Sequence, residues 1–349
     1  MTNGAGVASL KRVDDPFWDG LMPGSDPPLS ITLLRKIVSQ NSEVSFYRLH
    51  AFAAEQYVAV KEIAHPTEKS REALRLEFEA LRHVRKIARG ELDGSVPEPL
   101  RLSERQIMLG LVPGVPFDRT LKKNANLLSG WLHLDDLGHL GRQVGEWLAR
   151  FHHLMGSSEQ EYNVAEYMGE IENRLPQYEA CGIQAPTLRT VRERILQLSA
   201  ALDHRPVPRA ACHGDFIPQN ILLDGTKLGV VDFAGFREQA AIYHDLGHFL
   251  GYLTLLGLRP SYLSRALKTV ATGFVAGYST TLDLDLLRLF LVRAVLRMVT
   301  DRYFGTQAGK EPRGENLDSL LLDLTDARQQ LPLGIGDTRP SPLSRAENL

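Results

Sequence analysis

The feature that most restricts the fold of this chain is a stretch near its middle, CHGDFIPQNILLDGTKLGVVD, which spans Cys212–Asp232. Asn220 follows Asp215 by five positions, and Asp232 closes the stretch. Short apolar runs stand on both sides of Asp224-Gly225, a pair that is typical of hairpin turns. A tight hairpin would return Asn220 and Asp232 to the same end of a small sheet. The stretch therefore predicts two strands that bring polar oxygen ligands together; an ordinary hairpin with two turn aspartates is the simpler alternative.

The residue types and spacings also match a known catalytic pattern. The protein-kinase signature has an Asp, four intervening residues, an Asn and a later Asp-Phe-Gly. Here the last motif reads Asp232-Phe233-Ala234-Gly235, so the glycine is displaced by one position. Phosphoryl transfer requires a carboxylate near the attacking hydroxyl and oxygen ligands for Mg²⁺. Asp215 suits the first task, and Asn220 and Asp232 suit the second.

The block HGDFIPQNILLDGTKLGVVDF resembles the catalytic block of the aminoglycoside phosphotransferase and choline kinase family. These are kinase-fold enzymes that phosphorylate hydroxyl groups of small molecules. The resemblance implies an α+β, bilobal, protein-kinase-like fold, with a small N-lobe of antiparallel sheet plus helix and a larger, mainly helical C-lobe. It also implies ATP and Mg²⁺ as cofactors, Asp215 as the catalytic base, and Asn220 and Asp232 as the metal ligands.

A second motif lies in the alternating stretch Tyr57–Ile63, which predicts a strand. Its Val58-Ala59-Val60-Lys61 closely matches the kinase Val-Ala-Ile-Lys, whose lysine contacts the α- and β-phosphates of the nucleotide. A lone strand lysine is more often a solvated edge charge. Together with the central block, however, the match indicates that Lys61 binds a nucleotide.

A helix predicted over Thr67–Ile87 offers two glutamates as the partner of Lys61. Helical spacing places Glu77 with the apolar face, whereas Glu79 lies among arginines on the charged face. Helical geometry therefore selects Glu77. An ordinary ion pair with a neighbouring arginine is expected for Glu79.

Two further nucleotide contacts are expected from the resemblance. Residues 40–46 stand where protein kinases have a glycine-rich loop, but they contain no glycine. The resembled family often uses a Ser- and Asn-bearing turn there, so Ser42 and Ser45 are expected to offer hydroxyl or N–H groups; a plain hairpin turn is the alternative. The strand Arg105–Leu111 is expected to lead into the hinge, where adenine would meet backbone groups near Leu109 and Leu111.

The chain organisation expected from these motifs has four parts. They are an irregular N-terminal arm (1–30), a nucleotide-binding N-lobe (31–112), a catalytic and substrate-binding C-lobe (113–330) and a disordered tail (331–349). Phe17 and Trp18 of the arm are expected to pack back on a lobe.

Composition excludes several other classes of protein. The formal net charge of −2 gives no global basic field for nucleic acid or an anionic membrane. The most apolar stretch, Phe249–Leu258, is too short to span a bilayer, and the N-terminus lacks the pattern of a signal peptide. Cys181 and Cys212 are the two cysteines and have no disulfide or zinc spacing, so a reducing, cytoplasmic setting is the default expectation. Cys212 is expected to be a small buried residue.

Several charged residues near the block are expected to serve structure. His152, at the end of the helix predicted over Leu134–Leu154, and His213 are expected to order the catalytic region by hydrogen bonding. Asp245 is expected to cap a helix. The acidic stretch 159–172 could hold the amines of a cationic substrate, although a solvated helix face is the simpler interpretation. In the helix predicted over Leu284–Phe304, some arginines could contact an anionic substrate but are more simply surface charges or internal ion-pair partners: Arg288, Arg293 and Arg297.

The function expected from all of this is ATP-dependent transfer of the γ-phosphate to a hydroxyl of a small molecule, such as a sugar, an amino alcohol or an aminoglycoside. Two alternatives stay open. One is a kinase acting on a protein or on a lipid-linked saccharide, although no Ala-Pro-Glu segment follows Asp232. The other is a non-catalytic nucleotide-binding protein of the pseudokinase type. The sequence does not indicate an oligomeric state.

Overall fold

The computed structural model of the chain describes residues 16–19, 21, 30–38, 42–51, 54–88, 90–278, 281–305 and 315–335. The chain divides into two compact units. The first consists of Met1–Val115, His213–Asp215 and Asn220–Phe236, and the second of Pro116–Cys212, Phe216–Gln219 and Arg237–Leu349. Two segments of the central block thus group with the N-terminal sheet.

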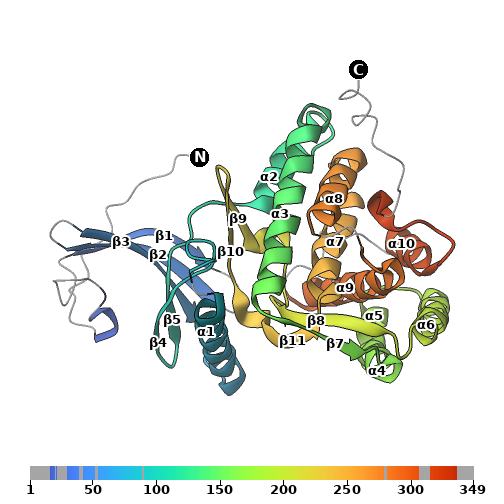
Figure 1. Cartoon of the computed structure of the whole chain (residues 1–349), viewed down its shortest axis with the longest axis horizontal. Coiled ribbons are helices and arrows are strands. Elements are labelled where there is room, and N and C mark those ends of the chain that lie inside the picture. Colours follow the sequence, from blue (N-terminus) through green and yellow to red (C-terminus); the bar gives the residue numbers. More distant parts are fainter. Residues whose placement is uncertain are drawn as a thin grey trace. The chain divides into compact units, whose positions relative to one another are not determined.

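The first unit is built on a five-stranded antiparallel sheet of order β1-β2-β3-β5-β4 (Figure 1). Its strands are β1 (Ser30–Val38), β2 (Ser42–Ala51), β3 (Ala54–Ile63), β4 (Pro99–Leu102) and β5 (Gln106–Gly110).

Alternation along β3 gives the sheet its two faces. Val58 and Val60 are buried in a core shared with Leu49 of β2 and Met108 of β5. The side chains of successive strand residues point to opposite faces, so Lys61 lies on the other face from these valines. The 3-10 helix η1 (Pro16–Trp18) closes the core, because Phe17 and Trp18 are buried in the same cluster, as expected from the sequence.

Helix α1 (Glu68–Ala88) belongs to the first unit and is amphipathic. Its buried positions recur at helical spacing and include Leu74, Glu77, Leu81 and Val84. A buried glutamate on such an apolar face requires a charged partner.

The central block forms the predicted hairpin. Strands β9 (Ile221–Asp224) and β10 (Lys227–Val230) pair in antiparallel register, with Val230 opposite Ile221. Val230 N–H donates to the carbonyl of Ser95 at 2.7 Å, which fixes the hairpin to the loop before β4. The short strand β6 (Val115–Pro116) lies at the chain boundary between the two units.

The second unit is mainly helical, and it also contains a three-stranded sheet of order β11-β8-β7 (Figure 1). These strands are β7 (Ser157–Glu161), β8 (Pro206–Cys212) and β11 (Arg237–Ala241). The helices are α2 (Phe117–Asn124), α3 (Leu134–Leu154), α4 (Val164–Glu172), α5 (Leu175–Ala180), α6 (Ala185–Ala200), α7 (Tyr243–Gly257), α8 (Ser264–Tyr278), α9 (Leu284–Gly305) and α10 (Glu315–Thr325). Within the described ranges, no helix combines the length and apolarity needed to cross a bilayer.

Three expectations change in this unit. Residues 157–161 form an edge strand, so Glu159 and Glu161 do not lie on a helix face. Helix α7 begins at Tyr243, so Asp245 lies inside its first turn and is not its N-cap. Part of the expected tail is described: a 3-10 helix, η5, spans Pro332–Gly334.

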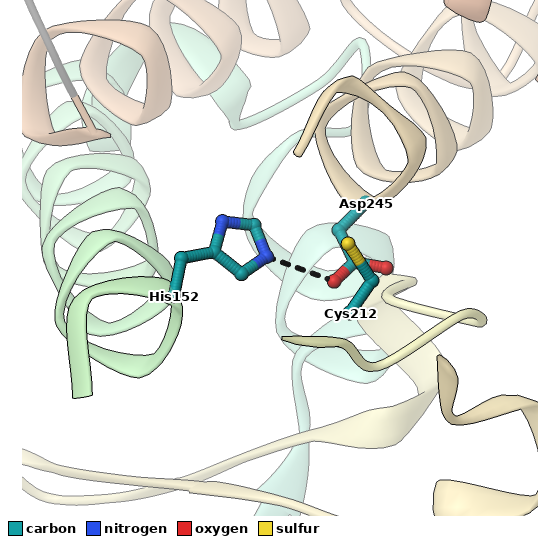
Figure 2. A group of neighbouring side chains, drawn as sticks. All are labelled: His152, Cys212 and Asp245. Carbon is teal, nitrogen blue, oxygen red and sulfur yellow. Dashed lines mark hydrogen bonds and ion pairs between the residues drawn. The ribbon is translucent and has the colours of Figure 1, made fainter. Parts of the chain in front are cut away.

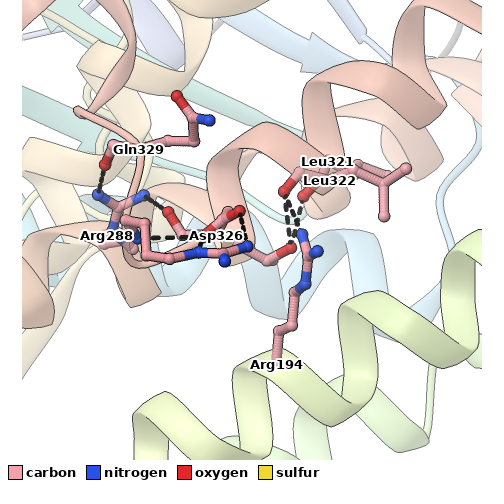
Figure 3. A network of polar contacts seen from close by, with 8 residues as sticks. Arg194, Arg288, Leu321, Leu322, Asp326 and Gln329 are labelled. Carbon is pink, nitrogen blue, oxygen red and sulfur yellow. Dashed lines mark hydrogen bonds and ion pairs between the residues drawn. The ribbon is translucent and has the colours of Figure 1, made fainter.

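Two arginines stabilise the end of α10 (Figure 3). Arg288 of α9 donates to the backbone carbonyls of Leu324, Asp326 and Gln329, and Arg194 of α6 donates to that of Leu322 at 2.8 Å. The last carbonyls of a helix have no intrahelical partner and carry partial negative charge, so guanidinium groups suit them. Arg288 therefore has a structural role.

Candidate active site

The amine of Lys61 lies between two carboxylates of the first unit. Lys61 Nζ donates to Glu77 Oε2 at 2.8 Å and to Asp232 Oδ1 at 2.9 Å. Its side chain is 19% exposed, so Lys61 is not a solvated edge charge. The contact to Asp232 joins residues 171 positions apart in the sequence.

Glu77 is the partner of Lys61, as helical geometry predicted. Its side chain is only 2% exposed, whereas Glu79 lies on the surface and pairs with Arg82 at 3.5 Å. Glu77 thus has one carboxylate oxygen on the amine and sits among the apolar residues of α1.

Lys61, Glu77 and Asp232 shift one another's pKa values. Burial alone would lower the pKa of Lys61, but Asp232 and Glu77 raise it well above its ordinary value, so the amine stays charged. Burial raises the pKa of Glu77 despite the opposing effect of Lys61. For Asp232, burial is outweighed by Lys61 and the N–H of Ala234, and its pKa is lowered. The geometry and these directions together indicate an ionised Lys61–Asp232 pair.

The β9–β10 hairpin brings Asp232 back to Asn220. Val231 N–H donates to the carbonyl of Asn220 at 2.9 Å, one step beyond the last strand pair. Asp232 follows with φ = +67°, in the left-handed region that Asp tolerates better than most residues. The hairpin thus returns Asn220 and Asp232 to the same end of the small sheet, as predicted.

Asn220 also fixes Asp215. Its Nδ2 donates to the backbone carbonyl of Asp215 at 2.9 Å and to Asp215 Oδ2 at 3.1 Å. Both partners are acceptors, so they determine which end of the amide faces them. The carbonyl Oδ1 of Asn220 is therefore the end that can bind a cation.

His213 orders the same loop through its two ring nitrogens. Its Nδ1 accepts from the N–H of Asp215 at 3.3 Å, and its Nε2 lies 3.0 Å from the carbonyl of Val231. These partners require a neutral ring protonated on Nε2. His213 thereby ties the Asp215 loop to the segment that leads into Asp232.

Two glycines allow these loops to meet. Gly214 has φ = +83°, and a Cβ placed on it would lie 1.7 Å from the carbonyl oxygen of Gly235. A Cβ on Gly235 would lie 3.0 Å from the carbonyl carbon of Gly214. The displaced glycine of Asp232-Phe233-Ala234-Gly235 therefore stands where the two backbones approach each other.

The serines expected at the phosphate loop lie on strand β2, which already begins at Ser42; residues 39–41 lie outside the described ranges. Ser45 is buried, and its hydroxyl donates to Glu43 Oε1 at 3.3 Å. Ser45 is thus a strand residue whose hydroxyl hydrogen is used locally, which argues against its expected contact with phosphate.

The expected hinge residues lie at the end of β5. Leu109 is opposite Ala59 of β3, and the N–H of Leu111 donates to the carbonyl of Tyr57 at 3.0 Å. The amide hydrogen of Leu111 is thus part of the sheet ladder, so this group is not a free donor for adenine.

A buried cluster in the second unit contains further residues of the types that bind metals: His152, Cys212 and Asp245 (Figure 2). His152 uses both ring nitrogens, with Nε2 3.1 Å from Asp245 Oδ2 and Nδ1 2.8 Å from Tyr278 Oη. Cys212 is fully buried, and burial and Asp245 raise the pKa of its thiol well above the ordinary value. The cluster is therefore a packed polar core, as expected for His152 and Cys212.

The model of the phosphotransferase enzyme family matches residues 37–283, well over half of the chain. The chain belongs to this phosphotransferase enzyme family. Membership confirms the predicted family and the predicted class of function, ATP-dependent phosphoryl transfer to a small molecule. No curated protein matches the sequence of this phosphotransferase.

Solved structures agree on the fold of the phosphotransferase. The gentamicin complex of APH(2'')-IIa is 16% identical, covers 88% of this chain and 94% of its own, and has a TM-score of 0.51. ADP-bound aminoglycoside phosphotransferase APH(2'')-Ib is 16% identical to this chain, with a TM-score of 0.50. The match covers 85% of this chain and 93% of that protein. The streptomycin–ATP complex of APH(2'')-IIa is 15% identical to this chain, with a TM-score of 0.50. The match covers 79% of this chain and 86% of that protein. The predicted kinase-like α+β fold is thereby confirmed.

Proposed function

We propose that this phosphotransferase transfers the γ-phosphate of ATP to a hydroxyl of a small molecule, with Asp215 as the catalytic base. The observation that carries the proposal is the position of Lys61, held between Glu77 and Asp232, in the unit that also contains Asp215 and Asn220. ATP as donor is consistent with the ATP complex of the similar structure described above.

Each residue has one proposed task. Lys61, kept charged and oriented by Glu77, binds the nucleotide phosphates. Asp215, whose Oδ2 is fixed by Asn220, orients the acceptor hydroxyl and accepts its proton. Because phosphoryl transfer depends largely on positioning and charge neutralisation, rigid placement of these groups is the main contribution of the protein.

The donor atoms of the site suit Mg²⁺, which prefers hard oxygen ligands. Asn220 directs its amide nitrogen to Asp215 and so leaves its carbonyl oxygen for a cation, and Asp232 is ionised. When bound, Mg²⁺ would neutralise charge on the nucleotide phosphates, with Asn220 and Asp232 as its protein ligands.

The test is a phosphorylation screen with Mg²⁺ and ATP over aminoglycosides, amino alcohols and sugars, with ³¹P NMR to detect a new phosphate ester. We expect at least one acceptor to be phosphorylated by the wild type and not by Asp215→Asn. Phosphorylation of a protein substrate, with no small molecule phosphorylated, would favour the protein-kinase alternative. ATP binding without transfer or hydrolysis would favour the pseudokinase alternative.

A further inference from the structure

The second unit contains a polar cavity of about 220 Å³. Its wall comes from strands β7, β8 and β11 and helices α4, α7 and α9, and it includes three arginines: Arg209, Arg237 and Arg293. Ligand pockets for drug-sized molecules are usually larger, roughly 300–1,000 Å³, so this cavity suits a metabolite of a few carbon atoms.

Two of the three arginines are held by the protein. Arg209 donates to the carbonyl of Gln239 at 2.9 Å. Arg293 pairs with Glu170 and lies over the ring of Phe290, with its Cζ 5.8 Å from the centroid. Neither side chain is free to turn away from the cavity without losing these contacts.

Arg237 differs from the other two. Its guanidinium has no hydrogen-bond or ion-pair partner among the residues that the structure describes, and solvent reaches it. Partial burial and the positive charges of Arg293 and Arg297 lower the pKa of the Arg237 guanidinium. Neighbouring guanidinium groups repel one another, and a bound anion would relieve this repulsion.

The acidic residues of the wall do not neutralise Arg237. Glu170 is paired with Arg293, and Glu161 with His204 at 2.8 Å. Of the carboxylates, Glu170 is the one whose charge raises the pKa of Arg237, and it is the partner of Arg293. A positive charge without a direct counter-ion therefore remains on the wall.

One buried atom of the wall also lacks a hydrogen bond. His244 is 4% exposed, lines the cavity, and has a buried Nδ1 without a hydrogen bond to any described residue. This nitrogen lies 3.9 Å from Asp245 Oδ1, beyond hydrogen-bond distance, so the wall contains an unsatisfied polar atom.

We propose that this cavity binds a small oxyanion, either a carboxylate or a phosphate ester, through the guanidinium of Arg237 with Arg293 beside it. A guanidinium presents two parallel N–H donors that match the two oxygens of either group. Every residue named here belongs to the second unit, whereas Lys61, Asp215 and Asp232 belong to the first. The proposal therefore does not depend on the function proposed above.

The test is calorimetric titration with inorganic phosphate and, separately, with succinate at constant ionic strength. We expect saturable binding of at least one of them to the wild type and at least tenfold weaker binding to Arg237→Gln. The matched control is Arg189→Gln, at an exposed arginine of α6 that does not line the cavity, and it should bind like the wild type. Which probe binds distinguishes a phosphate site from a carboxylate site.

Phosphate could also bind at Lys61, so a second variant separates the two sites. Lys61→Gln/Glu77→Gln removes that cation and its buried counter-ion together, and it should leave oxyanion binding unchanged. Circular dichroism confirms that each variant is folded. Binding that survives Arg237→Gln but is lost in the double variant, or no saturable binding of either probe to the wild type, would overturn the proposal.

Discussion

At the scale of single residues, Lys61 and its two carboxylates explain how a buried amine can stay charged. Glu77 is almost fully buried and has Lys61 as its charged partner. A hydrogen bond to a charged group contributes about 1.5–3 kcal/mol, so loss of the Glu77 charge should be readily measurable.

The first prediction concerns this pair. Glu77→Gln should leave Lys61 held by Asp232 alone and weaken ATP affinity about tenfold to a hundredfold, because the amine is no longer fixed from two sides. The measurement is ATP-analogue binding by calorimetry. Glu79→Gln, two positions along the same helix but exposed, is the control and should bind like the wild type. Equal losses in both variants would contradict the role given to Glu77.

The second prediction concerns Asp215. Asp215→Asn should lower kcat by about 10²–10⁴-fold, since a positioned general base contributes this much, while ADP affinity stays near the wild-type value. Asp224→Asn, in the exposed hairpin turn, is the matched control and should keep full activity. A parallel loss of ADP affinity in Asp215→Asn would show that Asp215 binds the nucleotide and does not act as the base.

Sequence reasoning reached some of these residue contacts and missed others. Helical spacing was sufficient to choose Glu77 over Glu79, because that choice depends only on which face of α1 is apolar. The contact between Lys61 and Asp232 was not predicted, because it depends on how the β9–β10 hairpin docks. Asp245 was placed at a helix start because Asp is a common N-cap, but in the structure its carboxylate pairs with buried His152 inside the helix.

At the scale of elements, the close approach of two loops positions the site. The third prediction is that Gly214→Ala destabilises the protein and removes activity, because a Cβ there meets the Gly235 carbonyl at 1.7 Å. Gly182→Ala is the control: Gly182 has a similar φ of +87°, but nothing lies within 4 Å of its Cβ position. A left-handed backbone costs a non-glycine residue about 1–2 kcal/mol in both variants. Denaturant unfolding should therefore show a clearly larger loss for Gly214→Ala; equal losses would mean that the loops can separate without cost.

Strands with strong local signals were predicted well, and edge elements were not. The alternation in β3 and the Asp-Gly turn of the β9–β10 hairpin indicated strands from local sequence alone. In contrast, residues 157–161 carry charges and small polar groups and were assigned to a helix face. They form the exposed edge strand β7 because β8 offers a pairing partner, and a charged edge is common in such strands.

At the scale of the whole molecule, buried histidines couple stability to pH. His244 and His248 of α7 are each 4% exposed. Burial and nearby positive charges outweigh the attraction of Asp245, lowering the pKa of His248 to about 3 and that of His244 well below its ordinary value. Arg237 and Arg293 act on both histidines, and Arg297 also acts on His248.

The fourth prediction follows from the sign of these shifts. Below about pH 6.5 the unfolded chain protonates both histidines, while the native state keeps them neutral. As the pH is lowered, the free energy of unfolding therefore decreases by about 1.4 kcal/mol per pH unit for each histidine. Denaturant titrations between pH 7 and 4 measure this slope. His248→Gln should reduce the slope by about 1.4 kcal/mol per pH unit, the contribution of one proton. His65→Gln, at an exposed position, should leave the slope unchanged. An unaltered slope in His248→Gln would contradict the account.

The central claim is that the Lys61–Asp232 region holds the metal-bound nucleotide. The most direct test is the affinity of the non-hydrolysable analogue AMP-PNP, measured by calorimetry with and without Mg²⁺, for the wild type and Asp232→Asn. We predict that Mg²⁺ tightens binding at least tenfold in the wild type and has little effect in Asp232→Asn. An equal effect of Mg²⁺ in both proteins would contradict the claim.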